Sequence, residues 1–485
     1  MPEVSENSPS SRKFWVYALL FALLHGAFAL TFAKETPYLM TGRVFNMGGG
    51  KDGIATDDIG APDELQHLIQ IGRIYNGEPF PHLVPNDPKI DFYYQGHQTP
   101  LFYYAGAGWC KLLGITETPK LAEFIRTHEN QELKDLLKKN TFEEIESTRE
   151  KIQSESLRMR LMSVLLGCIT VLGVYALGKW AYSEKIGLWA ASFAALLPMN
   201  VALSGAISND PMLICLSTWV VALLIGTMKT TLDWKRAMGI GVLAGLALLT
   251  KSSAMGLLPI MAFAFFMFRR ETGGEQTKWL RLGSVTLGVA LLFGGAWWIR
   301  NLQVYGEPLV INTFYEAFKD RTPTAELFIG RVGVTTYWKL FSEVAAQSFV
   351  GTFSYMDINL SDLTYKLAWL LFSGVGLIGY AGLKGRGKLA NWTLLVTFLV
   401  VFGLFVQFNR IFWQPQARYI LPAIGPIACL FGAGVNFLAE KSKTFLIPVI
   451  WVASMVLMVG SSLDQIKKEF PIRITAGKQN TDTTL

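Results

Sequence analysis

Long apolar stretches separated by short polar connections fill most of the chain. Most of these stretches run for about 17 to 22 residues, the length that a helix needs to cross the hydrocarbon core of a bilayer. Eleven spans are predicted, at residues 14–33, 159–178, 187–203, 211–228, 237–250, 252–268, 280–299, 363–383, 390–408, 419–438 and 444–462. The pattern therefore predicts an all-α polytopic membrane protein, with residues 1–485 forming one transmembrane domain.

The stretch from Thr99 to Gly114 decides the topology. It is apolar, but it is short, rich in glycine and tyrosine, and carries Lys111 near its end. If it does not span and the N-terminus is cytoplasmic, most lysines and arginines of the short loops fall on the cytoplasmic side, as the positive-inside rule requires. If it spans, every later loop inverts and the rule fails. We therefore expect residues 99–114 to lie along, or dip into, the outer interface.

Two large outer loops follow from this topology, at residues 34–158 and 300–362, with a short C-terminal tail at 464–485. Chemistry outside the membrane is expected to concentrate in these loops, because the other connections are short. Within the first loop, residues 116–157 are dense in Lys and Glu, with apolar residues at helical spacing. We expect a solvated helical hairpin that acts as a lid or spacer, with binding of an acceptor or a membrane-protein partner as the alternative.

Composition adds little to this picture. The 485 residues are 51% hydrophobic and 17% charged, with a formal net charge of +7. The basic residues cluster at the ends of apolar blocks, which membrane orientation alone explains, so the charge does not indicate a nucleic-acid partner. The four cysteines lie within apolar segments without paired spacing and are expected to be packing residues. The first apolar segment lacks a clear cleavage site and is expected to be a retained span.

An acidic pair stands early in the first outer loop, in the sequence Ala61-Pro-Asp-Glu-Leu-Gln-His67. Pro62 suits a first helical position, and Asp63 and Glu64 fall in the first turn, where the helix dipole favours negative charge. The spacing predicts a short amphipathic helix with one apolar face on the membrane and one polar face toward an aqueous or polar cavity. The pair is either a reaction centre or simply the favourable charge at a helix start.

Other polar residues are predicted to reach the same outer face. They come from the stretch around His97, the turn before the fourth span, and the outer ends of later spans. They are His67, His97, Asp210, Lys251, Arg300, Arg418 and Tyr419. Carboxylates and cations thus converge on one side of the membrane.

At this point the chain resembles a family. The resemblance rests on the acidic pair, on the His97-Gln-Thr-Pro-Leu-Phe-Tyr-Tyr104 stretch, on the outer aspartate after the third span, and on Ala417-Arg-Tyr-Ile-Leu-Pro422. In their order and side of the membrane these motifs resemble the GT-C superfamily of integral-membrane glycosyltransferases. The protein mannosyltransferase and aminoarabinose transferase group, and related bacterial membrane proteins with a late Gly-Arg-Tyr-Leu-Leu-Pro motif, are the most similar.

The resemblance implies transfer of a sugar from a polyprenyl-phosphate carrier to a hydroxyl acceptor at the outer face, here the periplasmic face of a bacterial inner membrane. Such a reaction needs a carboxylate to accept the proton of the acceptor, with Asp63 as first choice and Glu64 as second. It also needs cations for the leaving phosphate. Arg418 and Arg300 are the candidates, followed by Lys251; the alternative for each is an interfacial anchor.

The remaining candidates have roles in binding. Asp210 is expected to position the sugar or the acceptor, or to orient Arg418, with a simple turn as the alternative. His67, His97 and Tyr419 are candidate substrate contacts, and for the two histidines a structural or interfacial role is the competing interpretation.

A lipid-linked donor fits better than a nucleotide sugar, because the sequence has neither a Gly-rich nucleotide loop nor a soluble Asp-x-Asp domain. Asp57 and Asp58 could join Asp63 around a divalent cation, but the spacing is not that of a fixed site, so no cofactor is predicted. The competing hypotheses are a non-catalytic membrane subunit and a transporter of a lipid-linked glycan. A transporter usually shows related halves and ionisable residues at mid-membrane, which this sequence does not.

Overall fold

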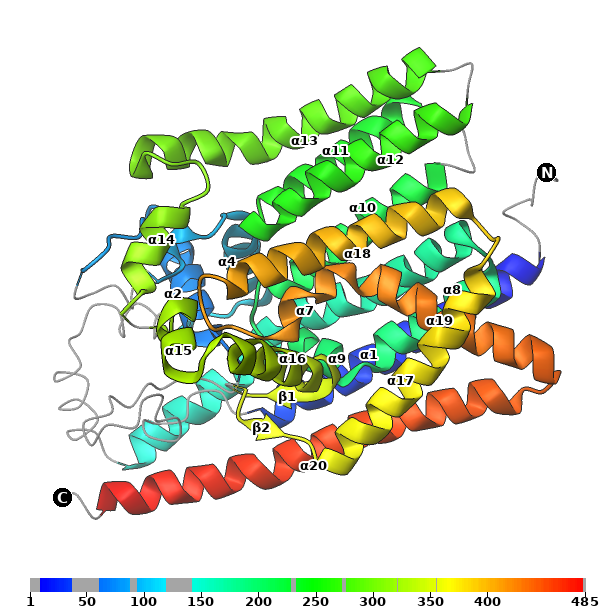
Figure 1. Ribbon diagram of the computed structural model, residues 1–485. Coiled ribbons are helices and arrows are strands. Elements are labelled where there is room, and N and C mark those ends of the chain that lie inside the picture. The colour runs from blue at the N-terminus through cyan, green and yellow to red at the C-terminus, as the bar shows by residue number, and fades with distance from the viewer. Residues whose placement is uncertain are drawn as a thin grey trace.

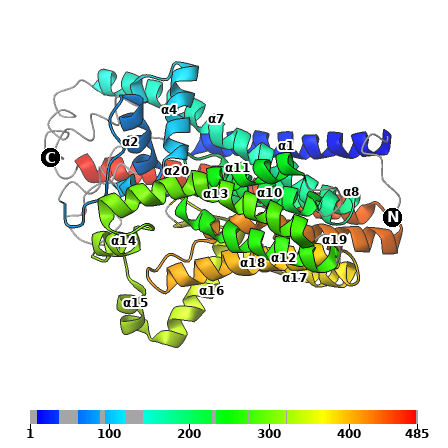
Figure 2. The same ribbon diagram turned by 90° about the horizontal axis from the view of Figure 1, so that it is seen from above.

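A computed structural model describes residues 9–36, 61–87, 94–118, 142–227, 233–272, 276–320, 322–354 and 356–482. Long helices lie side by side in a bundle, and short helices gather at one of its ends (Figure 1). The N-terminal end of α1 lies at the opposite end of the bundle from these short helices, and a second view shows the same arrangement (Figure 2). The predicted all-helical membrane architecture is confirmed.

Eight helices in the described part of the chain are long and apolar enough to cross a membrane. They are α1 (Pro9–Glu35), α7 (Phe142–Ala181), α10 (Asp210–Thr227), α13 (Gln276–Tyr305), α17 (Asp362–Leu383), α18 (Lys388–Asn409), α19 (Ile424–Ser442) and α20 (Leu446–Asp482). A ninth results if α8 (Glu184–Leu196) and α9 (Pro198–Ser204), which meet at 64°, form one broken span.

The predicted count of eleven spans is not confirmed. The two remaining predicted spans, at residues 237–250 and 252–268, coincide with the shorter helices α11 (Trp234–Leu248) and α12 (Leu257–Thr272). The 3-10 turn η2 (Ser252–Gly256) leads directly into α12. With 15 and 16 residues, α11 and α12 fall short of the roughly 20 that a spanning helix needs.

Side chains hydrogen-bond to the backbone carbonyls that the break between α8 and α9 leaves free. Pro198 has no backbone N–H, so the carbonyl of Ala194 loses its helical donor. Asn200 Nδ2 donates to that carbonyl at 2.8 Å. His25 of α1 reaches the next carbonyl, that of Ala195, with Nδ1 at 2.9 Å. The freed backbone acceptors are therefore satisfied inside the bundle, as a nonpolar surrounding demands.

Glycines allow neighbouring spans to approach closely. A Cβ added at Gly178 of α7 would lie 2.6 Å from the Cα of Gly187 in α8. No side chain fits at that distance, so the contact between the two backbones requires glycine. Small residues at helix contacts are the usual means of close packing in membranes.

Figures 1 and 2 show α2 (Glu64–Tyr75), α4 (Leu101–Leu113), α14 (Ile311–Phe318) and α15 (Ala325–Val332) at one end of the bundle. Further elements are η1 (Tyr94–His97), α16 (Val334–Gly351), η3 (Ala417–Tyr419) and η4 (Leu421–Ala423). A small antiparallel hairpin, β1 (Thr352–Phe353) with β2 (Ile358–Asn359), follows α16.

The stretch that decides the topology forms α4, a helix of 13 residues. This is too short to cross a bilayer, in agreement with the expectation that residues 99–114 do not span. Apolar residues of α4 pack against α2; buried Phe102 and Tyr103, for example, share a cluster with Leu68 and Ile71.

The helix that carries the acidic pair differs from its predicted setting. Its apolar Leu68 and Ile69 are buried, but so are His67, Gln70 and Arg73 on the predicted polar side. The apolar face of α2 is therefore covered by protein, and the prediction that it lies on the membrane is wrong. The helix is enclosed because α4 and η1 cover it, and the polar groups lie inside the protein.

The predicted charged hairpin falls partly outside the described residues, which stop at 118 and resume at 142. From Phe142 onward the chain is already α7, which continues for 40 residues into the membrane span. Glu155, expected to be solvated, is buried and accepts hydrogen bonds from the backbone nitrogens of Glu117 and Thr118 at 3.0 and 2.8 Å. It ties the segment after α4 to α7. In the same way, α20 runs on to Asp482 through the predicted tail.

Candidate functional site

Asp63 stands immediately before α2 with its side chain turned away from the helix. Its backbone is left-handed, with φ 63° and ψ 7°, a conformation that aspartate tolerates better than most residues. The carboxylate makes no capping hydrogen bond. Instead, Oδ2 accepts a hydrogen bond from Nη2 of Arg418 at 2.8 Å. Serving as a helix cap therefore does not explain Asp63.

Arg418 also lies near a second carboxylate, and that carboxylate binds a lysine. Its Nη1 lies 3.6 Å from Oδ2 of Asp210, the first residue of α10. The other oxygen of Asp210 accepts a hydrogen bond from Nζ of Lys251 at 2.6 Å. Asp63, Arg418, Asp210 and Lys251 thus form a line of alternating charge, here called the charge row. Residues far apart in the sequence meet in it.

The charge row is balanced and largely removed from water. The side chain of Asp210 is 3% exposed, that of Arg418 7%, that of Lys251 14% and that of Asp63 30%. Two anions and two cations cancel, which is the condition under which buried charges are tolerated. Burial on its own would raise the pKa of Asp63, but the Arg418 guanidinium holds that pKa below its usual value. Asp63 is therefore ionised at neutral pH, and its carboxylate is the most accessible of the four side chains.

Tyr419 supports both cations. Its hydroxyl accepts a hydrogen bond from Arg418 Nη2 at 3.2 Å. Its ring lies 5.3 Å from Lys251 Nζ and 5.1 Å from the guanidinium carbon of Arg418. Cation–π attraction of this kind strengthens when water is excluded. Tyr419, predicted as a substrate contact, therefore lies in the site as a support for its positive charge.

Glu64, the second predicted base, occupies a different environment from its neighbour. It is fully buried and forms a two-bond ion pair with Arg160 of α7, both distances being 2.8 Å. The backbone nitrogen of Ile207 donates to the same carboxylate at 2.8 Å. Arg160 in turn donates to the carbonyls of Ala33 and Thr36 at the end of α1. The geometry argues against Glu64 as a base and gives it the role of joining α1, α2 and α7.

Arg300 is predicted to bind the phosphate, but its contacts in the structure are with residues outside the charge row. Its guanidinium lies 4.7 Å from the ring of Trp297 and 5.8 Å from that of Phe80. It donates to the carbonyl of Pro81 and to Asn301 Oδ1, each at 3.2 Å. An aromatic enclosure and a backbone carbonyl hold it, which fits the alternative interpretation of an anchor.

The two candidate histidines are near the charge row but neutral. His67 donates through Nδ1 to the hydroxyl of Tyr103 at 3.0 Å, and that hydroxyl donates to Gln95. Burial lowers the pKa of His67 to about 3 and that of His97 to about 4. His97 Nδ1 is fixed by the carbonyl of Tyr94 at 2.7 Å. Neither histidine supplies positive charge for a phosphate near neutral pH.

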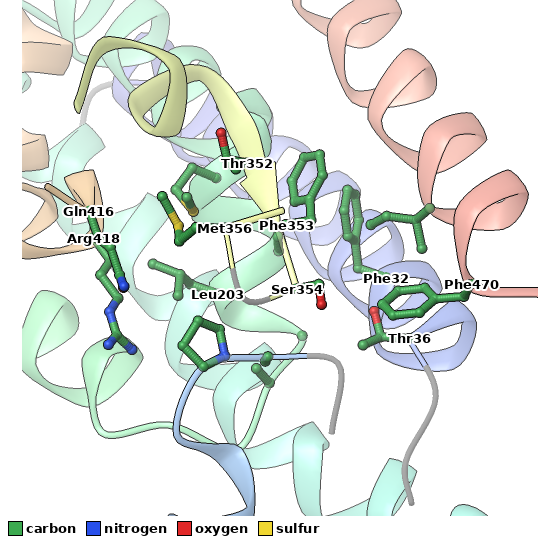
Figure 3. Close-up of a pocket in the computed structure, with 17 residues that line it drawn as sticks. Phe32, Thr36, Leu203, Thr352, Phe353, Ser354, Met356, Gln416, Arg418 and Phe470 are labelled. Atoms are coloured by element: carbon green, nitrogen blue, oxygen red, sulfur yellow. The ribbon is translucent and has the colours of Figure 1, made fainter. Parts of the chain in front are cut away.

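An apolar cavity begins beside Arg418 (Figure 3). Its empty space, which includes a part open to solvent, is about 530 Å³. Phe32 of α1 lies on one of its walls, with Phe353 of β1 and with Ile466 and Phe470 of α20. Pro62, next to Asp63, belongs to the lining as well. Figure 3 shows Arg418 and Gln416 on one side of the cavity and Phe32 and Phe470 on the other. A charged group and an apolar compartment thus adjoin.

Solved structures share the arrangement of helices. ArnT from Cupriavidus metallidurans, bound to undecaprenyl phosphate, matches with a TM-score of 0.54 at 12% identity, over 95% of this chain and 77% of that chain. The Archaeoglobus fulgidus oligosaccharyltransferase, in complex with Zn and sulfate, matches with a TM-score of 0.52 at 14% identity, over 91% of this chain and 53% of that chain. The chain thus spans about half the length of the archaeal protein. The chain shares the GT-C fold of these two proteins.

A third match agrees with this. Oligosaccharyltransferase AglB from Archaeoglobus fulgidus, in complex with an inhibitory peptide and a dolichol-phosphate, has a TM-score of 0.50 at 14% identity, over 97% of this chain and 56% of that chain. A family model described as dolichyl-phosphate-mannose-protein mannosyltransferase matches residues 150–298. Among curated proteins, none matches the chain in sequence. The family segment includes Asp210 and Lys251 of the GT-C fold but not Asp63 or Arg418.

Arg160 is the important residue that the sequence reasoning missed. It is the second residue of the predicted second span, which covers residues 159–178. An arginine within a span is costly unless it has a partner, so its position was a usable signal. In this GT-C fold its partner is Glu64, one of the two acidic residues that the sequence had singled out.

A divalent cation has no evident ligand set in the described residues. Among them, no group of three or more His, Cys, Asp or Glu side chains is arranged to hold a metal ion. The carboxylates of Asp63 and Asp210 face cationic side chains instead. Asp57 and Asp58, the other candidate ligands, lie outside the described residues.

Proposed function

We propose that this chain transfers a sugar from a polyprenyl-phosphate carrier to a hydroxyl acceptor at the outer, periplasmic face of a bacterial inner membrane. The observation that carries the proposal is the charge row directly beside an apolar cavity. The structures of ArnT bound to undecaprenyl phosphate and of AglB in complex with a dolichol-phosphate support a lipid-phosphate ligand for the same fold.

The proposal places the carrier across Arg418. Its isoprenoid chain would occupy the cavity lined by Phe32, Ile466 and Phe470, and its phosphate would lie against the guanidinium at the cavity edge. As the bond between sugar and phosphate breaks, the phosphate gains negative charge. Fixed cations in a site poor in water stabilise such developing charge strongly. Arg418 provides two N–H donors for this purpose and Lys251 a second positive charge.

Asp63 is the proposed base. The acceptor oxygen forms a bond to the anomeric carbon, the bond from that carbon to the phosphate oxygen breaks with its electron pair leaving on phosphate, and the acceptor proton passes to Asp63. Phosphate binding makes Asp63 a better base, because an anion on Arg418 weakens the attraction that lowers the pKa of Asp63. Binding of the donor thus makes Asp63 more basic. Attack from the side opposite the phosphate inverts the configuration at the anomeric carbon.

Asp210 has a positioning role in this scheme. One of its oxygens holds Lys251 and the other faces Arg418. It is more buried than Asp63, so it serves to keep the two cations at a fixed separation while phosphate binds. Because side chains supply the positive charge, the proposal requires no metal, and a chelator should leave the transfer rate unchanged.

A strain that lacks the protein provides the test. The lipid-linked donor should accumulate and a surface glycan, lipid or protein should lose one sugar, both visible by mass spectrometry. Wild-type protein should restore the sugar, and so should the control Glu35→Gln at a solvent-facing ion pair. Asp63→Asn should fail to restore it. A non-catalytic subunit predicts the opposite, namely full restoration by Asp63→Asn, and that result would overturn the proposal.

A further inference from the structure

A second polar network adjoins the charge row and has no part in the scheme above. Asn209, next to Asp210 in the chain, donates through Nδ2 to Oε1 of Gln98 at 3.3 Å. Gln98 Nε2 donates to Nε2 of His97 at 2.8 Å, and His97 Nδ1 donates to the carbonyl of Tyr94 at 2.7 Å. The network is neutral, in contrast to the charge row, and none of these residues lines the cavity beside Arg418.

Two buried atoms in this network lack partners. Asn209 and Thr99 are each 1% exposed. Within the described part of the chain, no group hydrogen-bonds to Oδ1 of Asn209 or to Oγ1 of Thr99. A buried polar atom left unpaired costs about 1–3 kcal/mol, and native proteins rarely leave one without a reason. Two of them beside a line of buried charges indicate a ligand that brings its own donors and acceptors.

Contacts on both sides of Gln98 and Thr99 hold this segment in place. The ring of His97 packs against Phe314 with centroids 4.7 Å apart, and also contacts Phe318. The backbone nitrogen of Leu101 donates to the carbonyl of Leu249 at 2.8 Å, just before Lys251. Gln98 and Thr99 are thus held between two fixed points, which makes the arrangement a preformed site and not a flexible loop.

We propose that Asn209, Gln98 and Thr99 form the subsite for the hydroxyl groups of the donor sugar. This proposal rests on the proposed function. The donor has three parts in a fixed order, namely an apolar chain, a phosphate and an uncharged sugar rich in hydroxyls. The structure offers matching surroundings in the same order: the apolar cavity, Arg418 with the rest of the charge row, and then neutral amide and hydroxyl groups.

The chemistry of the three side chains fits hydroxyl recognition. The carbonyl oxygen of Asn209 accepts from a sugar hydroxyl, and the hydroxyl of Thr99 both donates and accepts. Sites of this kind discriminate strongly, since a sugar without the matching hydroxyl leaves buried groups unpaired. Asn209 and Thr99 would therefore set which sugar the protein accepts, while Arg418 binds any polyprenyl phosphate.

Binding measurements with purified full-length protein in nanodiscs test this proposal. The probes are undecaprenyl phosphate alone and undecaprenyl phosphate carrying mannose, glucose or galactose. Wild-type protein should bind at least one sugar-bearing probe about tenfold more tightly than the bare carrier. Asn209→Ala and Thr99→Val should each lose most of that preference while binding the bare carrier normally, which also shows that they fold.

Thr250→Val is the matched control. Thr250 is a buried threonine beside Lys251 whose hydroxyl is already satisfied by the carbonyl of Leu246 at 2.8 Å, so its loss should leave the preference intact. A preference that survives in both Asn209→Ala and Thr99→Val would overturn the subsite, as would a wild-type protein that prefers none of the sugars. If wild-type protein binds no carrier at all, the proposed function fails and the subsite fails with it.

Discussion

Replacing Glu64 with glutamine should weaken folding severely and leave the chemistry alone. The Glu64 carboxylate accepts two hydrogen bonds from Arg160 and one from the backbone of Ile207, all at 2.8 Å. Glutamine keeps the size of the side chain, but it removes the negative charge and points an amide donor at the guanidinium. The guanidinium of Arg160, on a side chain that is 2% exposed, then loses the negative charge of Glu64.

The size of the effect follows from this burial. Breaking one partner out of a buried ion pair costs about 3–5 kcal/mol, a large part of the roughly 5–15 kcal/mol by which proteins are stable. The matched control is Glu35→Gln, which removes an ion pair to Lys467 with side chains 33% and 51% exposed. A pair of that kind contributes only about 0.2–1 kcal/mol.

Thermal unfolding in detergent or nanodiscs measures both variants. Glu64→Gln should lower the melting temperature far more than Glu35→Gln, while turnover per folded molecule stays near the wild-type rate. A double variant, Glu64→Leu with Arg160→Met, should recover much of the lost stability, because it removes both charges together. A Glu64→Gln protein that melts like wild type and yet has lost transfer would refute the reasoning and return Glu64 to the list of candidate bases.

Three further predictions concern the cations, the histidines and the topology. Arg418→Ala should lower turnover at least tenfold, and Arg418→Lys should restore it only in part, since a guanidinium binds two phosphate oxygens at once. Unchanged turnover in a well-folded Arg418→Ala protein would show that Arg418 is an interfacial anchor. Because the pKa of His67 is lowered to about 3, the transfer rate should show no inflection near pH 6.5. The melting temperature should nevertheless fall as the pH drops from about 6.5 toward 3, because in that range only the unfolded protein takes up a proton at His67. A His67→Phe protein whose melting temperature depends on pH in the same way would contradict this. Reporters fused after Lys120 and Ser208 should be external and one after Arg270 cytoplasmic, and the reverse pattern would overturn the assignment of the outer face.

The sequence predicted the positions of the long helices well, because the bilayer constrains their length and apolar character. Apolar length alone located the helices, because a chain in lipid must satisfy its backbone within each segment. It could not show that residues 187–203 form a helix broken at Pro198, since that break depends on His25 and Asn200 meeting the freed carbonyls. The predicted spans at residues 237–250 and 252–268 fall on α11 and α12, helices of 15 and 16 residues that the structure does not confirm as spans.

For the site, residue types were predictable and pairings were not. Asp63, Asp210, Lys251 and Arg418 were all candidates, yet the contact between Asp63 and Arg418 joins residues 355 positions apart. Asp63 and Glu64 are neighbours with the same chemistry, and only their burial and partners separate a proposed base from a structural ion pair. Arg300 contacts aromatic rings and carbonyl oxygens, which no spacing rule brings together.

The most direct measurement is the transfer rate of Asp63→Asn, with purified protein and the lipid-linked donor and acceptor identified in the deletion strain. Asparagine keeps the size and much of the hydrogen bonding to Arg418 but cannot accept the proton. The account predicts a loss of roughly a hundredfold or more in turnover, with folding intact and carrier binding retained. Turnover close to wild type in Asp63→Asn would contradict the claim that the charge row is a reaction centre.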